Sequence, residues 1–348
     1  MKKIFVTGGA GFIGSNFVRR LLSRNQGYEV VNYDELTYAG NLASLEDVDG
    51  RRDYRFVRGN ICDGARVHES MQGCDAVVHL AAESHVDRSI FEPAPVVETN
   101  VTGTFILLQV ARELRIQKFV HVSTDEVYGD LAPGERADEE HPLRPNSPYS
   151  ASKAAADLLV RAFVRTYGFP AVITRGSNNY GPYQFPEKFL PLMICHALED
   201  RPLPIYGDGQ QERDWIHVED HCRGVLAALE RGQVGEVYNI GGGNVQKNLC
   251  MAQSVLRLLG KPDALLASVG DRPGHDRRYA LDCTKISRQL GWHPLISLED
   301  GLCRTVQWYQ QNSAWLGAVR DGAYRNYYAQ HYEKREETLA WVRGSAGD

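Results

Sequence analysis

A tyrosine and a lysine stand four residues apart, at Tyr149 and Lys153, and together they could move a proton. Side chains at positions i and i+4 of a helix share one face, so the phenol and the ammonium would be neighbours. A nearby ammonium stabilises the phenolate, which is expected to lower the pKa of the tyrosine from about 10. Such a tyrosine can take a proton from a hydroxyl while hydride leaves the carbon that bears it. The spacing alone is common in proteins, so its weight depends on the rest of the chain.

Two adjacent carboxylates, Asp125 and Glu126, directly follow Thr124 at the end of an apolar run. Acidic residues are common in solvated turns, so the pair by itself indicates little. Two ionisable groups in different environments can, however, divide the tasks of general acid and general base. We therefore take Asp125 and Glu126 as a candidate acid–base pair. Thr124 is a candidate hydrogen-bonding partner for a reacting oxygen.

A glycine-rich loop near the N-terminus has the spacing of a phosphate-binding turn, with Gly8, Gly11 and Gly14 between an expected strand and an expected helix. The first glycine makes the tight turn, the second lets backbone approach a pyrophosphate, and the third lets the helix pack on the strand. Asp34 ends the next expected strand, 20 residues past Gly14. A carboxylate there binds ribose hydroxyls and repels a 2′-phosphate, which predicts NAD rather than NADP.

The elements that must position these residues alternate between strand and helix in the first half of the chain. Apolar faces predict helices at residues 12–22 and 101–114, and a third helix runs from Tyr149 to about residue 163. Short apolar runs predict strands at residues 4–6, 29–33, 54–57, 75–80 and 119–122. This alternation predicts an α/β fold with a doubly wound parallel sheet of the Rossmann type.

The pattern changes after about residue 175, where five prolines between residues 182 and 204 divide the chain into short pieces. We expect a first domain at residues 1–175, which binds the dinucleotide. A smaller, mixed α/β C-terminal lobe of irregular structure and short helices would follow at residues 176–348 and bind mainly substrate.

Segments near residues 214–242 are expected to return to the first domain, with a helix at 225–229 and a strand at 237–240. Residues 298–312 have the apolar stripe of a closing helix. The last five residues are expected to be loosely held, as chain termini commonly are.

Composition and charge argue against several classes of function. The 348-residue chain has a formal net charge of −5, whereas nucleic-acid-binding domains are usually basic. No apolar run reaches the roughly 18 residues that a membrane helix needs, and the N-terminal run is too short for a signal peptide. The seven cysteines have no CxxC spacing, so neither a disulfide framework nor a metal site is indicated. We expect a cytoplasmic protein that acts on a small molecule, without nucleic-acid or membrane partners.

The glycine loop, Thr124, Tyr149 and Lys153 together resemble the extended short-chain dehydrogenases/reductases. Within that superfamily, the Thr-Asp-Glu triplet resembles the dTDP-glucose 4,6-dehydratases. Two departures are small: Asn60 stands where this family often has Asp, and Gly176 replaces a somewhat larger residue. The resemblance covers residues 1 to about 310, through the segments HLAAESHVDRS (79–89), RGSNNYGPY (175–183), FPEK (185–188), LPIYG (203–207), RDWIHVED (213–220) and DRPGHDRRY (271–279).

The resemblance implies a nucleotide-sugar dehydratase with tightly bound NAD. Tyr149 would remove the O4 proton while hydride passes from C4 of the glucosyl ring to NAD⁺. Glu126 would then remove the C5 proton, and protonated Asp125 would donate to the departing C6 oxygen. Hydride would finally return to C6 as Glu126 reprotonates C5. A homodimer is also implied, with helices near residues 101–114 and 154–167 packed across a two-fold axis.

Binding residues follow from the same resemblance. The cofactor would be held by Gly8, Gly11, Phe12, Ile13, Gly14, Asp34, Asn60, Ile61, Ala81, Ala82, Tyr149 and Lys153. The substrate would be held by Ser84, Thr124, Asn179, Lys188, Pro204, Tyr206, Arg213, Asn248, His275 and Arg278. Of these, Arg213 and Arg278 are candidates to pair with a diphosphate, because a guanidinium suits bidentate phosphate contact.

Other functions stay open at this point. A nucleotide-sugar 4-epimerase or decarboxylase would use the same fold, but neither reaction needs an acid at O6, which disfavours both. A non-catalytic dinucleotide-sensing protein would not need to keep Thr124, Tyr149 and Lys153. The sequence leaves dTDP and UDP substrates as alternatives.

Overall fold

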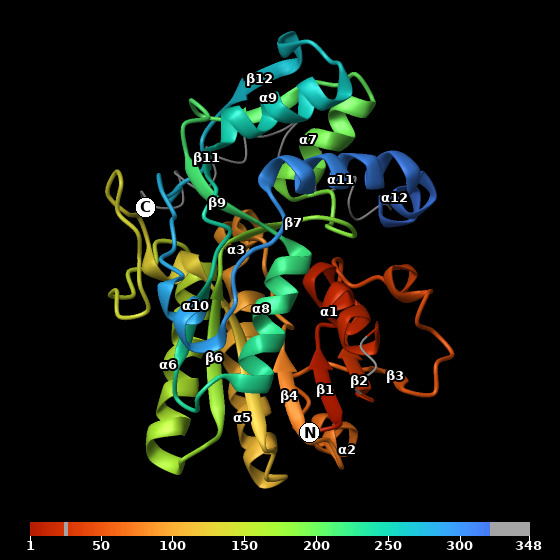
Figure 1. The fold of residues 1–348 in the computed structure, drawn as a ribbon, viewed down its shortest axis with the longest axis vertical. Coiled ribbons are helices and arrows are strands. Elements are labelled where there is room, and N and C mark those ends of the chain that lie inside the picture. Colours follow the sequence, from red (N-terminus) through yellow and green to blue (C-terminus); the bar gives the residue numbers. More distant parts are fainter. Residues whose placement is uncertain (24–26, 321–348) are drawn as a thin grey trace.

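A computed structural model describes residues 1–23 and 27–320 of the chain. Figure 1 shows a parallel sheet with helices on both faces in the lower part, and a smaller lobe of helices and short strands above it. The predicted α/β class and Rossmann-type sheet are confirmed. Among the described residues, no helix has the length and apolar composition that a membrane span requires.

Seven strands form the main sheet, and every neighbouring pair in it is parallel. The five predicted strands are confirmed, whereas β6 was not predicted. The strand order reverses between β1 and β4, and in such sheets ligands bind at the carboxyl ends of the strands flanking the reversal. In sheet order the strands are β10 (Val237–Ile240), β6 (Ala171–Gly176), β5 (Lys118–Thr124), β4 (Ala76–His79), β1 (Lys3–Thr7), β2 (Glu29–Asp34) and β3 (Tyr54–Arg58).

Both faces of the sheet are covered, which explains why its strands read as continuous apolar runs. In β1, Ile4 and Val6 pack into one core and Phe5 into the other. The first core is covered by α1 (Phe12–Ser23), α8 (Val218–Arg231) and α10 (Thr284–Leu290), the second by α2 (Gly64–Met71), α5 (Thr104–Glu113) and α6 (Pro148–Tyr167). The expected returning helix and strand correspond to α8 and β10, but the return of α10 was not predicted.

The helix expected at residues 101–114 begins differently. A π-helix at Glu98–Gly103 precedes α5, and such wide turns often occur at functional sites. Within it the Asn100 amide accepts a hydrogen bond from Glu83 N (2.9 Å) and donates to Ser152 Oγ (2.9 Å). Asn100 thus joins the loop after β4 to α6, a link that apolar periodicity could not indicate.

The lobe is more regular than predicted. Its apolar core is built by α7 (Phe189–Leu198), α9 (Asn248–Leu259), α11 (Leu298–Gln311) and α12 (Ser313–Val319). Strands β11 (Val245–Lys247), β9 (Glu212–His217) and β7 (Asn178–Tyr180) form one small sheet, and β12 (Leu266–Val269) pairs with β8 (Leu203–Tyr206). The mixed α/β composition expected of the lobe is confirmed, whereas its structure is more regular and most of its helices are longer than expected.

The prolines led to the expectation of irregular structure, but two of them occupy positions in regular elements where proline is compatible with the backbone hydrogen bonds. Pro191 lies in the first turn of α7, where its missing N–H is not needed. Pro204 lies in β8, which within residues 1–23 and 27–320 pairs with β12 alone, so one edge has no ladder to interrupt. The closing helix is confirmed as α11, and the last five residues lie outside the described part of the chain.

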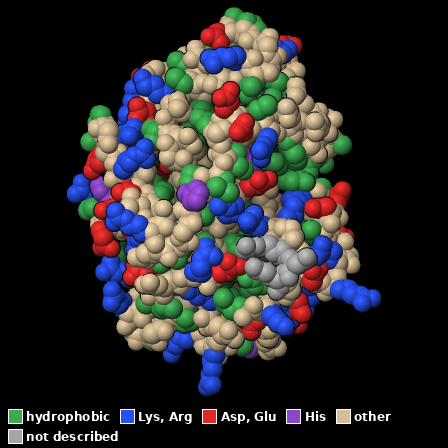
Figure 2. All heavy atoms as spheres, viewed as in Figure 1, with side chains coloured by type: hydrophobic (Ala, Val, Ile, Leu, Met, Phe, Trp, Pro, Cys, Tyr) green, Lys and Arg blue, Asp and Glu red, His purple; other side chains and the backbone are tan. Residues whose placement is uncertain are grey.

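Short elements complete the fold. They are α3 (Val86–Phe91), α4 (Pro93–Val97) and 3₁₀ turns at Leu42–Leu45, Asp125–Tyr128 and Asp263–Leu265. On the face shown in Figure 2, Lys and Arg side chains are interspersed with Asp and Glu side chains. Exposed ion pairs such as Arg51–Asp53 (2.7 Å) contribute little to stability.

Candidate active site

A cavity of about 300 Å³ opens at the carboxyl ends of β1, β2, β4 and β5. This is the edge of the sheet where the strand order reverses, so its position agrees with the general rule for such folds. Most of the predicted site residues line it: Gly8, Gly11, Phe12, Ile13, Gly14, Asp34, Ile61, Ala81, Ala82, Ser84, Thr124, Asp125, Glu126, Tyr149, Lys153, Asn179 and Lys188.

The three glycines of the loop meet different neighbours. Gly8 has φ +72°, and a Cβ there would lie 2.6 Å from Ala81 N. A Cβ on Gly14 would collide with the Gly8 carbonyl oxygen, so α1 could not pack against the loop. At Gly11 the nearest atom to a Cβ is 3.4 Å away, and this residue lines the cavity. The loop is therefore closed toward the protein and open toward the cavity, which fits a bound pyrophosphate.

Asp34 is held in position for a ribose. Its Oδ2 accepts a hydrogen bond from Ala10 N (2.9 Å) and its Oδ1 from Leu36 N (2.8 Å). Burial raises the pKa of Asp34, and these two N–H donors oppose that shift. Because a carboxylate oxygen can accept more than one hydrogen bond, both oxygens keep acceptor capacity for ribose hydroxyls.

Asn60 does not line the cavity, although its neighbours Gly59 and Ile61 do. Its side chain donates to Glu35 Oε1 (3.0 Å) and accepts from Cys62 N (2.7 Å). These contacts fix the loop after β3, and a direct contact between Asn60 and the cofactor stays a prediction.

Tyr149 and Lys153 lie on α6, whose first turn is fixed by a capping box between Ser147 and Ser150. Both side chains are buried, and Tyr149 is hydrogen-bonded to the Thr124 side chain. Lys153 Nζ donates to the carbonyl oxygen of Val122 (2.8 Å) on β5. The helix and the end of β5 therefore bring the phenol, the hydroxyl and the ammonium to one wall of the cavity.

The expected lowering of the Tyr149 pKa is wrong for this arrangement. Burial raises the pKa of Tyr149 and the charge of Glu126 adds to the increase, while the hydrogen bond from Thr124 opposes it. Burial also lowers the pKa of Lys153 to about 8, so the charge of its ammonium is itself sensitive to pH near neutrality. Desolvation thus outweighs the helical pairing that motivated the expectation.

Asp125 and Glu126 occupy the 3₁₀ turn after β5, and Thr124 caps this turn by accepting a hydrogen bond from Glu126 N (3.3 Å). Burial raises the pKa of Asp125 well above its ordinary range, and the charges of Glu126 and Asp214 add to this. The predicted direction is confirmed, although burial is a larger cause than the neighbouring charge. Asp125 Oδ2 is buried and has no hydrogen-bond partner among the described residues.

Glu126 is surrounded by cations. Burial raises its pKa as well, but the charges of Arg272, Arg213 and Lys188 oppose the increase. For Asp125 the main opposing influences are the charge of Arg213 and the hydrogen bond with Thr124. The surroundings therefore separate the pKa values of the two carboxyls. Asp125 more readily stays protonated and can act as the acid, whereas Glu126 more readily stays ionised and can act as the base.

Three of the predicted substrate residues besides Thr124 line the cavity. Lys188 Nζ donates to the carbonyl oxygen of Ser84 (2.5 Å), so the two residues meet across the lobe boundary. Asn179 Nδ2 donates to the carbonyl oxygen of Ser177 (3.0 Å), and its Oδ1 is buried without a hydrogen-bond partner among the described residues. These polar atoms are available to a ligand.

The remaining six predicted substrate residues lie in the lobe and do not line this cavity: Pro204, Tyr206, Arg213, Asn248, His275 and Arg278. Arg213 Nη2 donates to the Asp276 carbonyl oxygen (2.8 Å), and its guanidinium lies 4.3 Å from the Tyr279 ring centre. Arg278 forms an ion pair with Glu212. Their contacts with a substrate stay predictions, and the guanidinium of Arg278 already has a carboxylate partner.

Several residues at the site were missed. Glu187 is buried and accepts hydrogen bonds from Arg88 at 2.5 and 3.2 Å. Tyr38 lines the cavity from the loop after β2, and Arg88 lies 4.0 Å from its ring centre. The position of that loop directly after Asp34 was a usable signal, because ligands bind beyond the carboxyl ends of strands. The pairing of Arg88 with Glu187 had no signal in local sequence.

The chain matches the family model for GDP-mannose 4,6 dehydratase over residues 5–305. It is 50% identical to a dTDP-glucose 4,6-dehydratase from Salmonella typhimurium, with 96% of this chain and 100% of the relative covered. It is 51% identical to the enzyme of that name from Xanthomonas campestris, over 92% of this chain and 96% of the relative.

The chain belongs to the dTDP-glucose 4,6-dehydratase family. A solved dTDP-glucose 4,6-dehydratase from Streptomyces venezuelae, with NAD and a thymidine nucleotide bound, superimposes with a TM-score of 0.89. That match has 50% identity and covers 91% of this chain and 99% of the other. A UDP-glucose 4-epimerase from Thermotoga maritima has a TM-score of 0.83 at 32% identity, covering 89% of this chain and 99% of the other. The fold is thus shared with epimerases, and the higher identity separates the dehydratase family from them.

The contacts of Asp34 predict which nucleotide the purified protein carries. Asp34→Asn keeps the size of the side chain but removes the charge that repels a 2′-phosphate, so NAD content should fall relative to NADP. Nucleotide extracted from the wild-type protein and the variant, separated by chromatography, measures this. Asp53→Asn, which changes an exposed acid in an ion pair with Arg51, is the matched control. Wild-type protein that carries only NADP would contradict the assignment.

Proposed function

We propose that the protein converts dTDP-glucose to dTDP-4-keto-6-deoxyglucose and water. The observation that carries this proposal is the Asp125–Glu126 pair, with Asp125 buried and Glu126 partly buried, beside Tyr149 and Lys153 in the cavity that the glycine loop enters. Relatives of the same name at 50 and 51% identity support it. The glycine loop and Asp34 would hold NAD, which would supply the hydride acceptor for oxidation at C4 and the hydride donor for reduction at C6.

Tyr149 takes the proton from the sugar O4 as C4 is oxidised. Its hydrogen bond with Thr124 holds the phenol at the end of β5 and lets Thr124 contact the same oxygen. The raised pKa of Tyr149 means that the phenol is protonated when alone, so it acts best when positive charge is close. Lys153, fixed on β5 through Val122, supplies such charge on this chain when its ammonium is protonated, which the lowered pKa of about 8 makes pH-dependent near neutrality.

The elimination needs a base at C5 and an acid at O6. Glu126 takes the C5 proton, because three surrounding cations favour its ionised form. Asp125 gives its proton to the C6 oxygen, because burial keeps it protonated. Water leaves with that proton, and Glu126 later returns its own proton to C5. Two carboxyls with separated pKa values therefore suffice for both proton transfers.

The lobe binds the nucleotide end of the substrate in this proposal. Residues 1–175, with the returning α8 and β10, form the dinucleotide-binding domain, and residues 176–348 mainly hold the nucleotide sugar. Arg213, Lys188 and Asn179 present cationic or unpaired polar atoms near the reacting carboxyls, which supports this placement. A diphosphate there would be attracted by the same cations that act on Glu126.

We also propose that the protein is a homodimer through α5 and α6. Phe105 on α5 and Leu158 and Tyr167 on α6 are 38, 54 and 52% exposed, and Val97 on the preceding α4 is 50% exposed. Large apolar side chains gathered on neighbouring helices are typical of an interface. The cytoplasmic location stays a prediction.

The direct test of function compares dTDP-glucose with UDP-glucose as separate substrates. We expect the 4-keto-6-deoxy product from dTDP-glucose, detected by its absorbance in alkali, and much slower conversion of UDP-glucose. Equal or faster conversion of UDP-glucose would overturn the choice of base, and no product from either would overturn the dehydratase.

Tyr149→Phe keeps the ring and removes the phenolic base. Loss of a general base should lower turnover by roughly 10²–10⁴-fold, measured as product formed under saturating substrate. Tyr28→Phe is the matched control, since it removes a buried hydroxyl that contacts Glu230 at 3.1 Å and does not line the cavity. A Tyr149→Phe enzyme with more than half of wild-type turnover would remove Tyr149 from the mechanism.

The two carboxyls should fail in different ways. In Asp125→Asn the acid is lost, so oxidation of C4 should proceed while water loss slows, and the absorbance of reduced nicotinamide should accumulate after mixing with dTDP-glucose. In Glu126→Gln the base is lost, so solvent deuterium should no longer enter C5. Rapid-scan absorbance and mass spectrometry measure these outcomes.

Glu135→Gln is the control for these two variants, because Glu135 is exposed. If Asp125→Asn forms product at the wild-type rate without any transient, Asp125 is not the acid and the assignment fails.

A further inference from the structure

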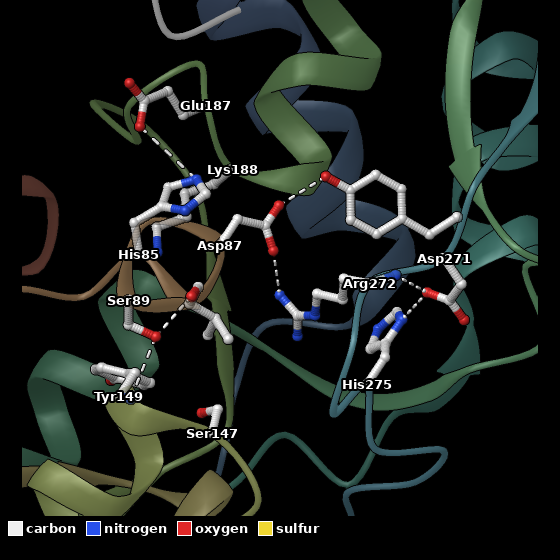
Figure 3. A network of polar contacts seen from close by, with 12 residues as sticks. His85, Asp87, Ser89, Ser147, Tyr149, Glu187, Lys188, Asp271, Arg272 and His275 are labelled. Carbon is white, nitrogen blue, oxygen red and sulfur yellow. Dashed lines mark hydrogen bonds and ion pairs between the residues drawn. The ribbon is translucent and has the colours of Figure 1, made fainter. Parts of the chain in front are cut away.

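The short helix α3 (Val86–Phe91) lies between the catalytic helix and the lobe. It belongs to the HLAAESHVDRS segment, whose polar residues after Ser84 have no place in the proton transfers described above. Figure 3 shows Asp87 of this helix directed toward Arg272 and Ser89 directed toward Tyr149. One six-residue helix therefore contacts both ends of the site.

Asp87 makes the contacts with the lobe. Its Oδ2 accepts a hydrogen bond from the Tyr206 phenol (2.7 Å) at the end of β8, and its Oδ1 accepts one from Arg272 Nη1 (2.9 Å). Asp87 is only 4% exposed, yet the charge of Arg272 helps to hold its pKa below the ordinary value against burial. Removing one partner of such a buried pair leaves an uncompensated charge, which is strongly unfavourable.

Two further contacts strengthen the same boundary. Arg88 of α3 donates to Glu187 of the lobe at 2.5 Å, and His85 Nε2 lies 3.7 Å from Glu187 Oε2. The two ion pairs have opposite polarity. The α3 helix supplies the carboxylate of Asp87 to Arg272 and the guanidinium of Arg88 to Glu187. This alternation fixes the register of α3 against the lobe more closely than one pair would.

Ser89 makes the contact with the catalytic helix. Its Oγ accepts a hydrogen bond from the backbone N of Tyr149 (3.3 Å) and donates to the Val86 carbonyl oxygen (2.6 Å). Val86, Val96 and Tyr149 form a small apolar cluster beside these bonds. The position of the Tyr149 backbone therefore depends on α3.

Arg272 links the Asp87 contacts to Glu126, the proposed base. Its positive charge acts on Asp87, with which it pairs, and it is the largest influence that opposes the raised pKa of Glu126. Arg272 Nε is buried and has no hydrogen-bond partner among the described residues. Asp87 thus fixes the guanidinium through Nη1 and leaves its charge to act on Glu126.

We propose that Asp87 is a positioning residue that holds Tyr206 and Arg272 of the lobe in register with Tyr149 through α3. The proposal rests on the proposed function, because it assigns the lobe to the nucleotide and Tyr149 to the reaction. Asp87 contacts neither Tyr149 nor Glu126 directly, so its effect on turnover passes through Arg272 and Ser89.

The test uses Asp87→Asn in the full-length protein with its bound cofactor. We expect the affinity for thymidine diphosphate, measured by calorimetry, to fall roughly tenfold, and kcat for dTDP-glucose to fall by a similar factor or more. The extracted NAD content should stay at the wild-type level, because the side chains of α3 bond to Tyr206, Arg272, Glu187 and the Tyr149 backbone rather than to the glycine loop or Asp34.

Asp220→Asn is the matched control for stability. Asp220 is an equally buried carboxylate that pairs with Arg223 (2.5 Å) and accepts from Leu295 N and Ile296 N, away from the cavity. It should lower the melting temperature without changing thymidine diphosphate affinity or kcat. If Asp87→Asn changes those two constants no more than Asp220→Asn does, the role of Asp87 is structural only and the proposal is overturned.

Ser89→Ala tests transmission through α3, because it removes the bond to Tyr149 N without touching the lobe. We expect the double variant with Asp87→Asn to lose less kcat than the product of the single losses. Independent effects would overturn the proposal. If Asp87→Asn does not fold, Tyr206→Phe takes its place in the same cycle, since it removes one of the two bonds to Asp87. Wild-type protein that binds thymidine diphosphate but forms no product would instead overturn the proposed function.

Discussion

Two carboxyls, Asp125 and Glu126, lie next to each other at the end of β5, the first buried and the second partly buried, and most of the site is explained by what this requires. Taking one carboxylate out of water costs several kcal/mol, and two adjacent charges would repel as well. The protein meets this by keeping Asp125 protonated and by surrounding Glu126 with Arg272, Arg213 and Lys188. All three cations come from the lobe, whereas both carboxyls come from the 3₁₀ turn that directly follows β5 of the main sheet.

The reacting groups therefore depend on how the lobe sits on the sheet. A small displacement of the lobe would move three cations away from Glu126 but would leave Tyr149 and Lys153 in place on α6. The contacts across this boundary, from α3 to Tyr206 and Arg272 and from Lys188 to Ser84, are short and partly buried. The position of the lobe thus affects the reaction, because cations of the lobe influence whether the base Glu126 is ionised.

The sheet and the cofactor loop could be predicted from sequence because their signals are local. A strand buried on both faces reads as one apolar run, and the three glycines of the loop stand within seven residues of one another. The network around Asp87 could not be derived in the same way, since its partners lie 119 and 185 residues away. Family resemblance placed the HLAAESHVDRS segment in the site but gave Asp87 and Ser89 no task.

The Tyr149 pKa shows a second kind of limit. Spacing on a helix correctly placed Tyr149 and Lys153 on one face, but it does not report how much water either side chain retains. In the folded protein both are buried, so desolvation raises the pKa of the phenol and lowers that of the ammonium, and the Glu126 charge adds to the first effect.

These shifts have a consequence for the order of events. Beside a charged Glu126 the phenolate form of Tyr149 is less populated, because each negative charge disfavours the other. Once Glu126 has taken the C5 proton it is neutral, and its contribution to the raised pKa of Tyr149 is removed, while the larger contribution of burial remains. The proton that Tyr149 gains at O4 and the proton that Glu126 gains at C5 are therefore coupled through one electrostatic field. The same field is set in part by Arg272, so the lobe influences both proton transfers although it supplies neither acid nor base.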